Sequence, residues 1–167
     1  MQKSVDQSEP LFFDATPYLR LFIDKEGKWY QNGAEIIHAG VLSQFFEALE
    51  KDKSGGYRIR IGREVCSVEV EDAPFIVLGV VKQEDGDLRL ELNDGEHETF
   101  DPDRFWINNQ NIPYSMVKNG EFPARFSRPA YYELAKCVVF DEEKQTFLIN
   151  LNGELKPIKI DAASYID

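Results

Sequence analysis

Asn32-Gly33 and Phe45-Phe46-Glu47 are followed, 87 and 86 residues further along the chain, by Asn119-Gly120 and Tyr131-Tyr132-Glu133. In both places a turn-forming pair precedes an aromatic pair in a segment of helical pattern. Asn-Gly is the strongest short-range signal of a β-hairpin, because both central residues of a type I′ turn need a positive φ. Repetition at a nearly constant offset predicts two copies of one structural unit.

The residues around the first pair predict a β-meander, a helix and a β-hairpin. Apolar residues at helical spacing favour a helix over about 40–51, and Ser54-Gly55-Gly56 ends it. Tyr57 to Ile61 alternates strictly between polar and apolar side chains, as a half-buried strand does. The predicted strands are 18–23, 28–31, 34–37, 57–61 and 65–70.

The second copy repeats this order of elements. Ser127 is placed to cap a short helix, and Pro129 suits its first turn. The predicted strands are 105–107, 114–118, 121–126, 137–140, 146–151 and 155–160. The fold class that follows is α+β, duplicated, with mostly antiparallel sheets.

Residues 75–103 predict an additional hairpin between the copies. Nine acids and one base give the segment 84–103 a net charge of −8, so the rest of the chain carries only −3 of the total −11. We therefore divide the chain into an N-terminal arm (1–16), a first repeat unit (17–74), an acidic linking hairpin (75–103) and a second repeat unit (104–167).

Composition limits the class of protein. The 167 residues are 43% hydrophobic, yet no apolar run approaches the ~20 residues that span a bilayer. The polar residues 1–10 lack the apolar core of a signal peptide, so we expect a cytoplasmic protein without membrane contact. Cys66 and Cys137 are expected as buried reduced thiols. The acidic charge opposes polynucleotide binding and leaves a small anion open as a ligand.

Several segments also resemble the bacterial domain of unknown function 1285 family, over about residues 17–153. These segments are Leu19-Arg20-Leu21-Phe22-Ile23-Asp24, Gly27-Lys28-Trp29, Val70-Glu71-Asp72-Ala73-Pro74-Phe75, Ala124-Arg125-Phe126-Ser127-Arg128 and Tyr131-Tyr132-Glu133-Leu134. The resemblance implies a duplicated α+β fold whose C-terminal half is loosely similar to a pleckstrin-homology barrel. It also implies a ligand site where the halves meet and a signalling role with a nucleotide-like ligand.

No motif predicts catalysis, a metal site or a cofactor. His38 and His97 lie in different segments without zinc-ligand spacing, and neither a Walker pattern nor G-x-G-x-x-G occurs. Asp85-Gly86-Asp87 and Asp94-Gly95-Glu96 fit turns better than a calcium loop. An enzyme is thus the third hypothesis, behind a ligand-binding module and a protein-interaction adaptor that uses the acidic hairpin or a barrel groove.

The first group of candidate ligand-binding residues surrounds the start of the second helix. Arg125 and Arg128 bracket a helix N-terminus that favours anions, and Tyr131 or Tyr132 offers a face for stacking. The alternative is that Arg128 pairs with local acids such as Glu133 while the tyrosines pack in the core.

Arg58, Arg60 and Arg63 form a second basic group on one strand face, of which Arg58 and Arg60 are candidate ligand-binding residues, and Trp29 is a further candidate. The alternative for these arginines is pairing with Glu64, Glu69 or Glu71 across the hairpin. The leading hypothesis is a non-enzymatic module that holds a small anionic, nucleotide-like ligand at the seam between the copies.

Overall fold

The computed structural model describes residues 19–160, and the expected N-terminal arm (1–16) lies outside them. The chain divides into two compact units, which are described separately. Among the described residues, the first comprises 19–24 and 28–71, and the second comprises 25–27 and 72–160.

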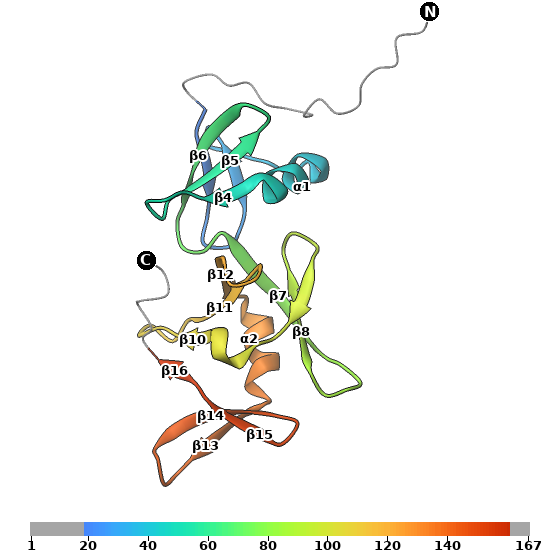
Figure 1. The fold of residues 1–167 in the computed structure, drawn as a ribbon, viewed down its shortest axis with the longest axis vertical. Coiled ribbons are helices and arrows are strands. Elements are labelled where there is room, and N and C mark those ends of the chain that lie inside the picture. Colours follow the sequence, from blue (N-terminus) through green and yellow to red (C-terminus); the bar gives the residue numbers. More distant parts are fainter. Residues whose placement is uncertain (1–18, 161–167) are drawn as a thin grey trace, which may run out of the picture. The chain divides into compact units, whose positions relative to one another are not determined.

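The first unit is one six-stranded sheet with one helix (Figure 1). Its strands lie in the order β3-β2-β1-β6-β5-β4, and every neighbouring pair is antiparallel except β1 and β6. The elements are β1 (Leu21–Ile23), β2 (Trp29–Gln31), β3 (Ala34–Glu35), α1 (Ala39–Ala48), β4 (Leu49–Lys51), β5 (Tyr57–Ile61) and β6 (Glu64–Val70).

The core of the first unit lies between α1 and the inner face of this sheet. Trp29 is only 1% exposed and contacts the rings of Phe45 and Phe46 on α1, at 5.6 Å in each case. The helix begins where the sequence predicts, because the His38 side chain accepts a hydrogen bond from the Val41 backbone N–H. An aromatic cluster around one indole therefore holds the helix on the sheet.

The helix ends earlier than its apolar stripe predicts. Leu49 belongs to β4, where it pairs with Ile59 of β5, and the predicted extension to residue 51 is wrong. Leu49 is buried in the strand, and an apolar residue is equally expected on the inner side of a helix. Its apolar character alone therefore does not distinguish the last turn of a helix from a strand.

The second unit contains a seven-stranded sheet, order β16-β10-β11-β12-β7-β8-β9, and a three-stranded sheet, order β13-β14-β15. Figure 1 traces both in the later part of the chain. The elements are β7 (Phe75–Lys82), β8 (Leu88–Leu92), β9 (His97–Thr99), the 3-10 helix η1 (Pro102–Arg104), β10 (Phe105–Ile107), β11 (Pro113–Val117), β12 (Phe122–Phe126), α2 (Arg128–Ala135), β13 (Val138–Asp141), β14 (Thr146–Leu151), β15 (Glu154–Pro157) and β16 (Lys159–Ile160).

Residues 75–103 are part of the second unit, in contrast to the linking hairpin expected from the sequence. β7 pairs in parallel with β12, and the Phe75 ring packs on Phe122 at 5.4 Å. β7 is an apolar strand with Val77 fully buried, so it needs neighbours that a free-standing hairpin would not supply. The acidic residues sit on a hairpin that is anchored inside a sheet.

The duplication is visible in the strand pairing. In the first unit the first strand of the meander, β1, pairs in parallel with the C-terminal part of the last strand, β6. In the second unit β10 pairs in the same way with β16, while β15 just before it pairs with β14 as the start of β6 pairs with β5. Both copies thus have the order meander, helix, hairpin, returning strand.

The two Asn-Gly turns differ. Asn32 and Gly33 form a two-residue turn with φ of 48° and 84° between the paired residues Gln31 and Ala34. Asn119-Gly120 lies instead in a four-residue loop, 118–121, because Val117 pairs with Phe122. The fold class α+β, with mostly antiparallel sheets, is confirmed; the likeness to a pleckstrin-homology barrel stays a prediction.

We expect Trp29→Ala to lower the free energy of unfolding of the first unit by about 3–5 kcal/mol, because it removes the ring on which both helix aromatics pack. Urea denaturation followed by circular dichroism measures this. Tyr132→Ala, at a ring 63% exposed, is the control and should change stability by less than about 0.5 kcal/mol. Equal effects of the two substitutions would contradict the assignment of Trp29 to the core.

Candidate functional site: a groove on the first unit

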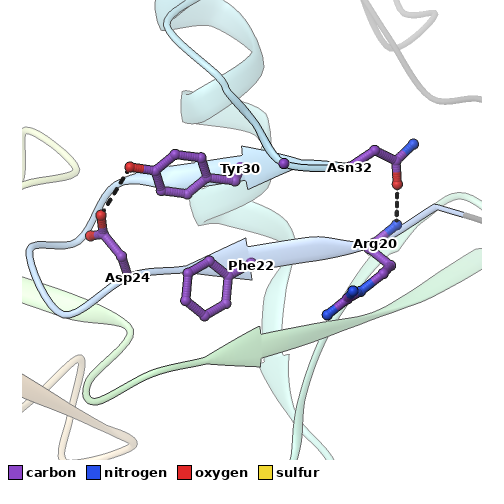
Figure 2. Close-up of a pocket in the computed structure, with 6 residues that line it drawn as sticks. Arg20, Phe22, Asp24, Tyr30 and Asn32 are labelled. Carbon is purple, nitrogen blue, oxygen red and sulfur yellow. Dashed lines mark hydrogen bonds between the residues drawn. The ribbon is translucent and has the colours of Figure 1, made fainter.

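A groove of about 600 Å³ lies on the outer face of the first unit (Figure 2). Its lining residues come from β1, β2 and the turns beside them: Arg20, Phe22, Asp24, Tyr30, Asn32 and Gly33. Strand alternation explains this set, because Leu21 and Ile23 point into the core, so Phe22 points outward.

Two aromatic rings form the floor of this groove. Phe22 and Tyr30 are directly opposite each other on neighbouring strands, with ring centroids 6.0 Å apart and planes tilted by 41°. Both side chains are half-buried. The arrangement leaves aromatic surface that a flat ring of a ligand can contact.

Polar groups stand at the two ends of the aromatic pair, as Figure 2 shows. At one end the Arg20 backbone N–H donates to Asn32 Oδ1 at 2.8 Å, and the Arg20 guanidinium lies 3.0 Å from Glu69. At the other end the Tyr30 hydroxyl donates to Asp24 Oδ2 at 3.0 Å. The groove is therefore cationic at one end and acidic at the other.

The Arg20 ion pair is exposed, with side chains 73% (Arg20) and 62% (Glu69) accessible. Such surface pairs contribute about 0–1 kcal/mol. A ligand anion can therefore replace Glu69 beside Arg20 at little cost.

Arg58 and Arg60 lie on the same outer face of the sheet, on β5. Both pair with Glu50 of β4, at 2.6 and 3.3 Å, and not with the acids of β6 named as alternatives. The sequence analysis missed these pairs because it assigned residue 50 to the helix. Since β6 alone separates β5 from β1, the two arginines stand roughly 10 Å from the groove.

Arg125 in the second unit belongs to a cluster of hydrogen-bonded side chains with Asp72 and Tyr114. Its guanidinium lies 3.1 Å from Asp72, and the Tyr114 hydroxyl donates to both oxygens of the same carboxylate, at 2.8 and 2.9 Å. Burial raises the pKa of Tyr114 far above its usual value, and the hydrogen bond to Asp72 adds to the shift. This cluster fixes β11 and β12 to the segment before β7.

The other candidates near α2 are more dispersed. Arg128 is exposed and makes no ion pair with the residues that the structure describes, while Glu133 pairs with Lys136 instead, at 2.9 Å. Tyr131 is half-buried and donates to Asn111 Oδ1 at 3.2 Å, whereas Tyr132 faces solvent. Tyr131 lines a hollow of the second unit with Asn111 and Leu134, whereas Arg125 is held by Asp72.

Trp29 is buried in the core and offers no face to a ligand from solvent. The sequence analysis missed Phe22 and Tyr30. Their signal was available, because outward Arg20, Phe22 and Asp24 alternate with inward Leu21 and Ile23. The ligand site expected at the seam between the copies stays a prediction.

The second copy has an aromatic pair at the same register, but it is closed. Trp106 and Tyr114 are opposite each other on neighbouring strands, as Phe22 and Tyr30 are. The turns that follow β1 and β10 also match. The backbone N–H of Asp24 donates to the Lys28 carbonyl, and that of Asn108 donates to the Ile112 carbonyl. Trp106 and Tyr114 stack at 5.4 Å, are 1% and 2% exposed, and pack with Ala73. The same pair is core in one copy and groove in the other.

Comparisons with known proteins identify the fold. No family model and no curated protein matches the chain. A crystal structure of a DUF1285 family protein from Silicibacter pomeroyi DSS-3 matches with a TM-score of 0.67 and 19% identity, over 84% of this chain and 80% of the other. The chain has the fold of this DUF1285 protein.

A second DUF1285 family structure, from Shewanella baltica OS155, matches with a TM-score of 0.59 and 19% identity, over 74% of this chain and 94% of the other. The resemblance noted in the sequence is thus confirmed at the level of fold.

Three further properties bear on the site. Within residues 19–160 no three His, Cys, Asp or Glu side chains are grouped to hold a metal ion. No helix in that range is both long and apolar enough to cross a bilayer. Cys66 and Cys137 are both free thiols, and burial raises the pKa of Cys66.

The matched pair Tyr30→Phe and Tyr114→Phe tests the difference between the two copies. We expect Tyr114→Phe to lower the free energy of unfolding by about 1.5–3 kcal/mol, because the half-buried Asp72 carboxylate loses a hydrogen bond from a buried hydroxyl. Tyr30→Phe, at the open position, should cost less than about 1 kcal/mol. Chemical denaturation measures both, and an equal cost would show that the two pairs are equally buried.

Glu50 gives a pH-dependent contribution to stability. Its hydrogen bond from Arg58, followed by the charges of Arg58 and Arg60, holds the pKa of Glu50 below its ordinary value of 4.5. A lowered pKa stabilises the fold above the unfolded value, and this stability is lost as pH falls through the folded value. Glu50→Gln should therefore lose less stability than the wild type on acidification from about pH 5 to pH 3. Glu47→Gln, at an exposed acid of α1, should keep the wild-type slope.

Proposed function

We propose that the protein is a non-enzymatic module that binds a small anionic ligand with a flat aromatic ring, of nucleotide type, in the groove of the first unit. The observation that carries this proposal is the half-buried Phe22–Tyr30 pair, which lines a groove while its counterpart in the second copy is fully buried. This difference at matching strand positions supports a binding role for the first pair.

The aromatic pair supplies the contact for the ring. Stacking of a base on an aromatic side chain contributes about 1–3 kcal/mol in nucleic-acid complexes and tolerates any base, because every base has a π-face. The tilt of 41° between Phe22 and Tyr30 allows a ring to lie on one of them and meet the edge of the other.

Arginines supply the contact for the anion. Arg20 stands at one end of the aromatic pair and its guanidinium matches a phosphate in a two-point hydrogen bond. Arg58 and Arg60, roughly two strand spacings away, extend the positive region for a second phosphate. Three arginines on one sheet face thus offset the acidic charge of the chain locally.

The groove suits binding more than conversion. Of the residues that the structure describes, those lining the groove are two aromatic rings, an arginine, an asparagine, a glycine and one aspartate, which already accepts hydrogen bonds from Tyr30 and from the Lys28 backbone. None of the six is a histidine, cysteine or serine that could form a nucleophile and base pair. A cytoplasmic signalling role is part of the proposal, and the two free thiols support a reducing compartment.

The adaptor hypothesis ranks second. Part of the negative charge of the acidic hairpin is neutralised within the second unit, because Asp94 pairs with Lys118 and Glu91 pairs with Arg89. A basic protein partner would have to compete with these pairs or use the remaining carboxylates.

We expect AMP and ADP to bind the full chain measurably, inorganic phosphate to bind much more weakly and adenosine to bind more weakly than AMP. Phe22→Ala removes the stacking surface and Arg20→Ala the anion contact, and each should weaken AMP binding by about 5- to 150-fold, from the loss of ~1–3 kcal/mol. Isothermal titration calorimetry measures the affinities.

Two matched variants separate a specific site from general charge effects. Arg63→Ala removes an exposed arginine in the turn between β5 and β6, and Tyr132→Ala an exposed ring of the second unit. Neither should change the affinity for AMP by more than about twofold. If no nucleotide binds, or if Arg63→Ala weakens binding as much as Arg20→Ala does, the proposal is wrong.

A further inference from the structure

The second unit contains an apolar hollow of about 460 Å³ between β10, β16, α2 and the three-stranded sheet. None of the lining residues within 19–160 is charged. Its walls include Phe105, Ile107, Leu134, Val138, Phe147 and Ile158. Asn108, Asn109 and Asn111 form a polar edge on one side.

The hollow occupies the place where the first unit has its core. Strand register makes Ile107 the counterpart of Ile23, since each follows the outward aromatic of its strand. In the same way Val138 corresponds to Leu49, since each begins the strand that follows the helix. Ile158 corresponds to Val68, since each comes directly before the residue that pairs with the outward aromatic of the first strand. Positions that enclose a filled core in one copy therefore enclose a space in the other.

A smaller residue stands in place of an indole opposite Ile107, which lines the hollow. In the first unit Trp29 stands opposite Ile23 and is 1% exposed. In the second unit the residue opposite Ile107 is Pro113, whose ring is far smaller. The helix residue that corresponds to Phe45 is Leu134, because each is a buried residue seven positions after its N-cap, and Leu134 is the smaller side chain.

Phe147 is the lining residue that β14 contributes, and the Phe140 ring opposite it on β13 lies 4.9 Å away between centroids. Both residues are 47% exposed. In the first unit the register places Tyr57 and Lys51 at these two positions. An apolar pair in place of a pair that includes a cation favours an uncharged ligand at this wall of the hollow.

We propose that this hollow is a second binding site, for an uncharged apolar ring compound about the size of indole, and that the ligand fills the place that the Trp29 indole fills in the first copy. The amides at the edge of the hollow bind a single polar group of the ligand, and Asn109 is exposed there. The site is independent of the groove proposed above, because all its lining residues belong to the second unit.

Indole is the probe, added to the full chain carrying ¹³C-labelled methyl groups. We expect saturable shifts of the methyl resonances of Ile107, Val138 and Ile158, with no comparable shift at Val68 in the first unit. Indole-3-acetate should bind at least about tenfold more weakly, because its carboxylate would enter an apolar site without a partner.

Neighbouring residues of β13 provide a matched pair of variants. Val138 lines the hollow, whereas Val139 points to the other face of the strand. Val138→Phe should abolish the indole shifts, and Val139→Phe should leave them unchanged. Ala135→Leu, at a helix position that also lines the hollow, is a second blocking variant if Val138→Phe fails to fold.

Three outcomes would overturn the proposal. The first is no saturable shift up to the solubility of indole, and the second is equal binding to the blocked and unblocked variants. The third is binding that appears only after removal of residues 161–167, which would show that the chain's own C-terminal segment occupies the hollow.

Discussion

The parallel ladder between the first and last strands of each copy is the contact on which the rest of the fold depends. Leu21 pairs with Val68, and Trp106 with Lys159, so each ladder joins residues about fifty positions apart. Such pairing requires the intervening chain to close into a long loop, so it forms more slowly than a local hairpin does. The meanders and hairpins can therefore form early, while the core of each copy is closed only when its returning strand arrives.

This closure explains why the two copies offer different surfaces. In the first copy β6 runs unbroken from its hairpin partner to β1, and one sheet covers a core filled by Trp29. In the second copy the same path is split at Ile158 into β15 and β16, and the hairpin becomes a separate small sheet. In the first copy the interior is filled by Trp29 and the groove lies on the outer face. In the second copy the outer aromatic pair is buried, and the hollow lies on the inner side of the sheet.

Local patterns in the sequence were sufficient for most of the fold. Strict alternation located β5 to the residue, the predicted bounds 146–151 of β14 are confirmed, and the Ser127 and Pro129 signals located the start of α2. β4 was missed because Leu49 continues a helical stripe, and the membership of residues 75–103 was missed because pairing between β7 and β12 is non-local. A pattern within a strand does not specify its neighbour in the sheet.

The same limit governed the site. Arginine and tyrosine clusters near α2 were visible in the sequence, but whether Arg125 is free depends on Asp72, which lies 53 residues earlier. The groove required knowing that β1 and β2 present Phe22 and Tyr30 on one face.

The β7 strand has one more consequence, for contacts between chains. In the second copy β7 covers the outer edge of β12, whereas no strand within residues 19–160 pairs with the outer side of β3, the matching edge of the first copy. An open edge invites pairing with another chain, and proteins protect it by making it short and charged. β3 has only two residues, one of them Glu35, and both are exposed. The first copy thus resists edge-to-edge aggregation because its edge strand β3 is too short to pair with another chain. The second copy resists it because β7 already pairs with β12 at that position.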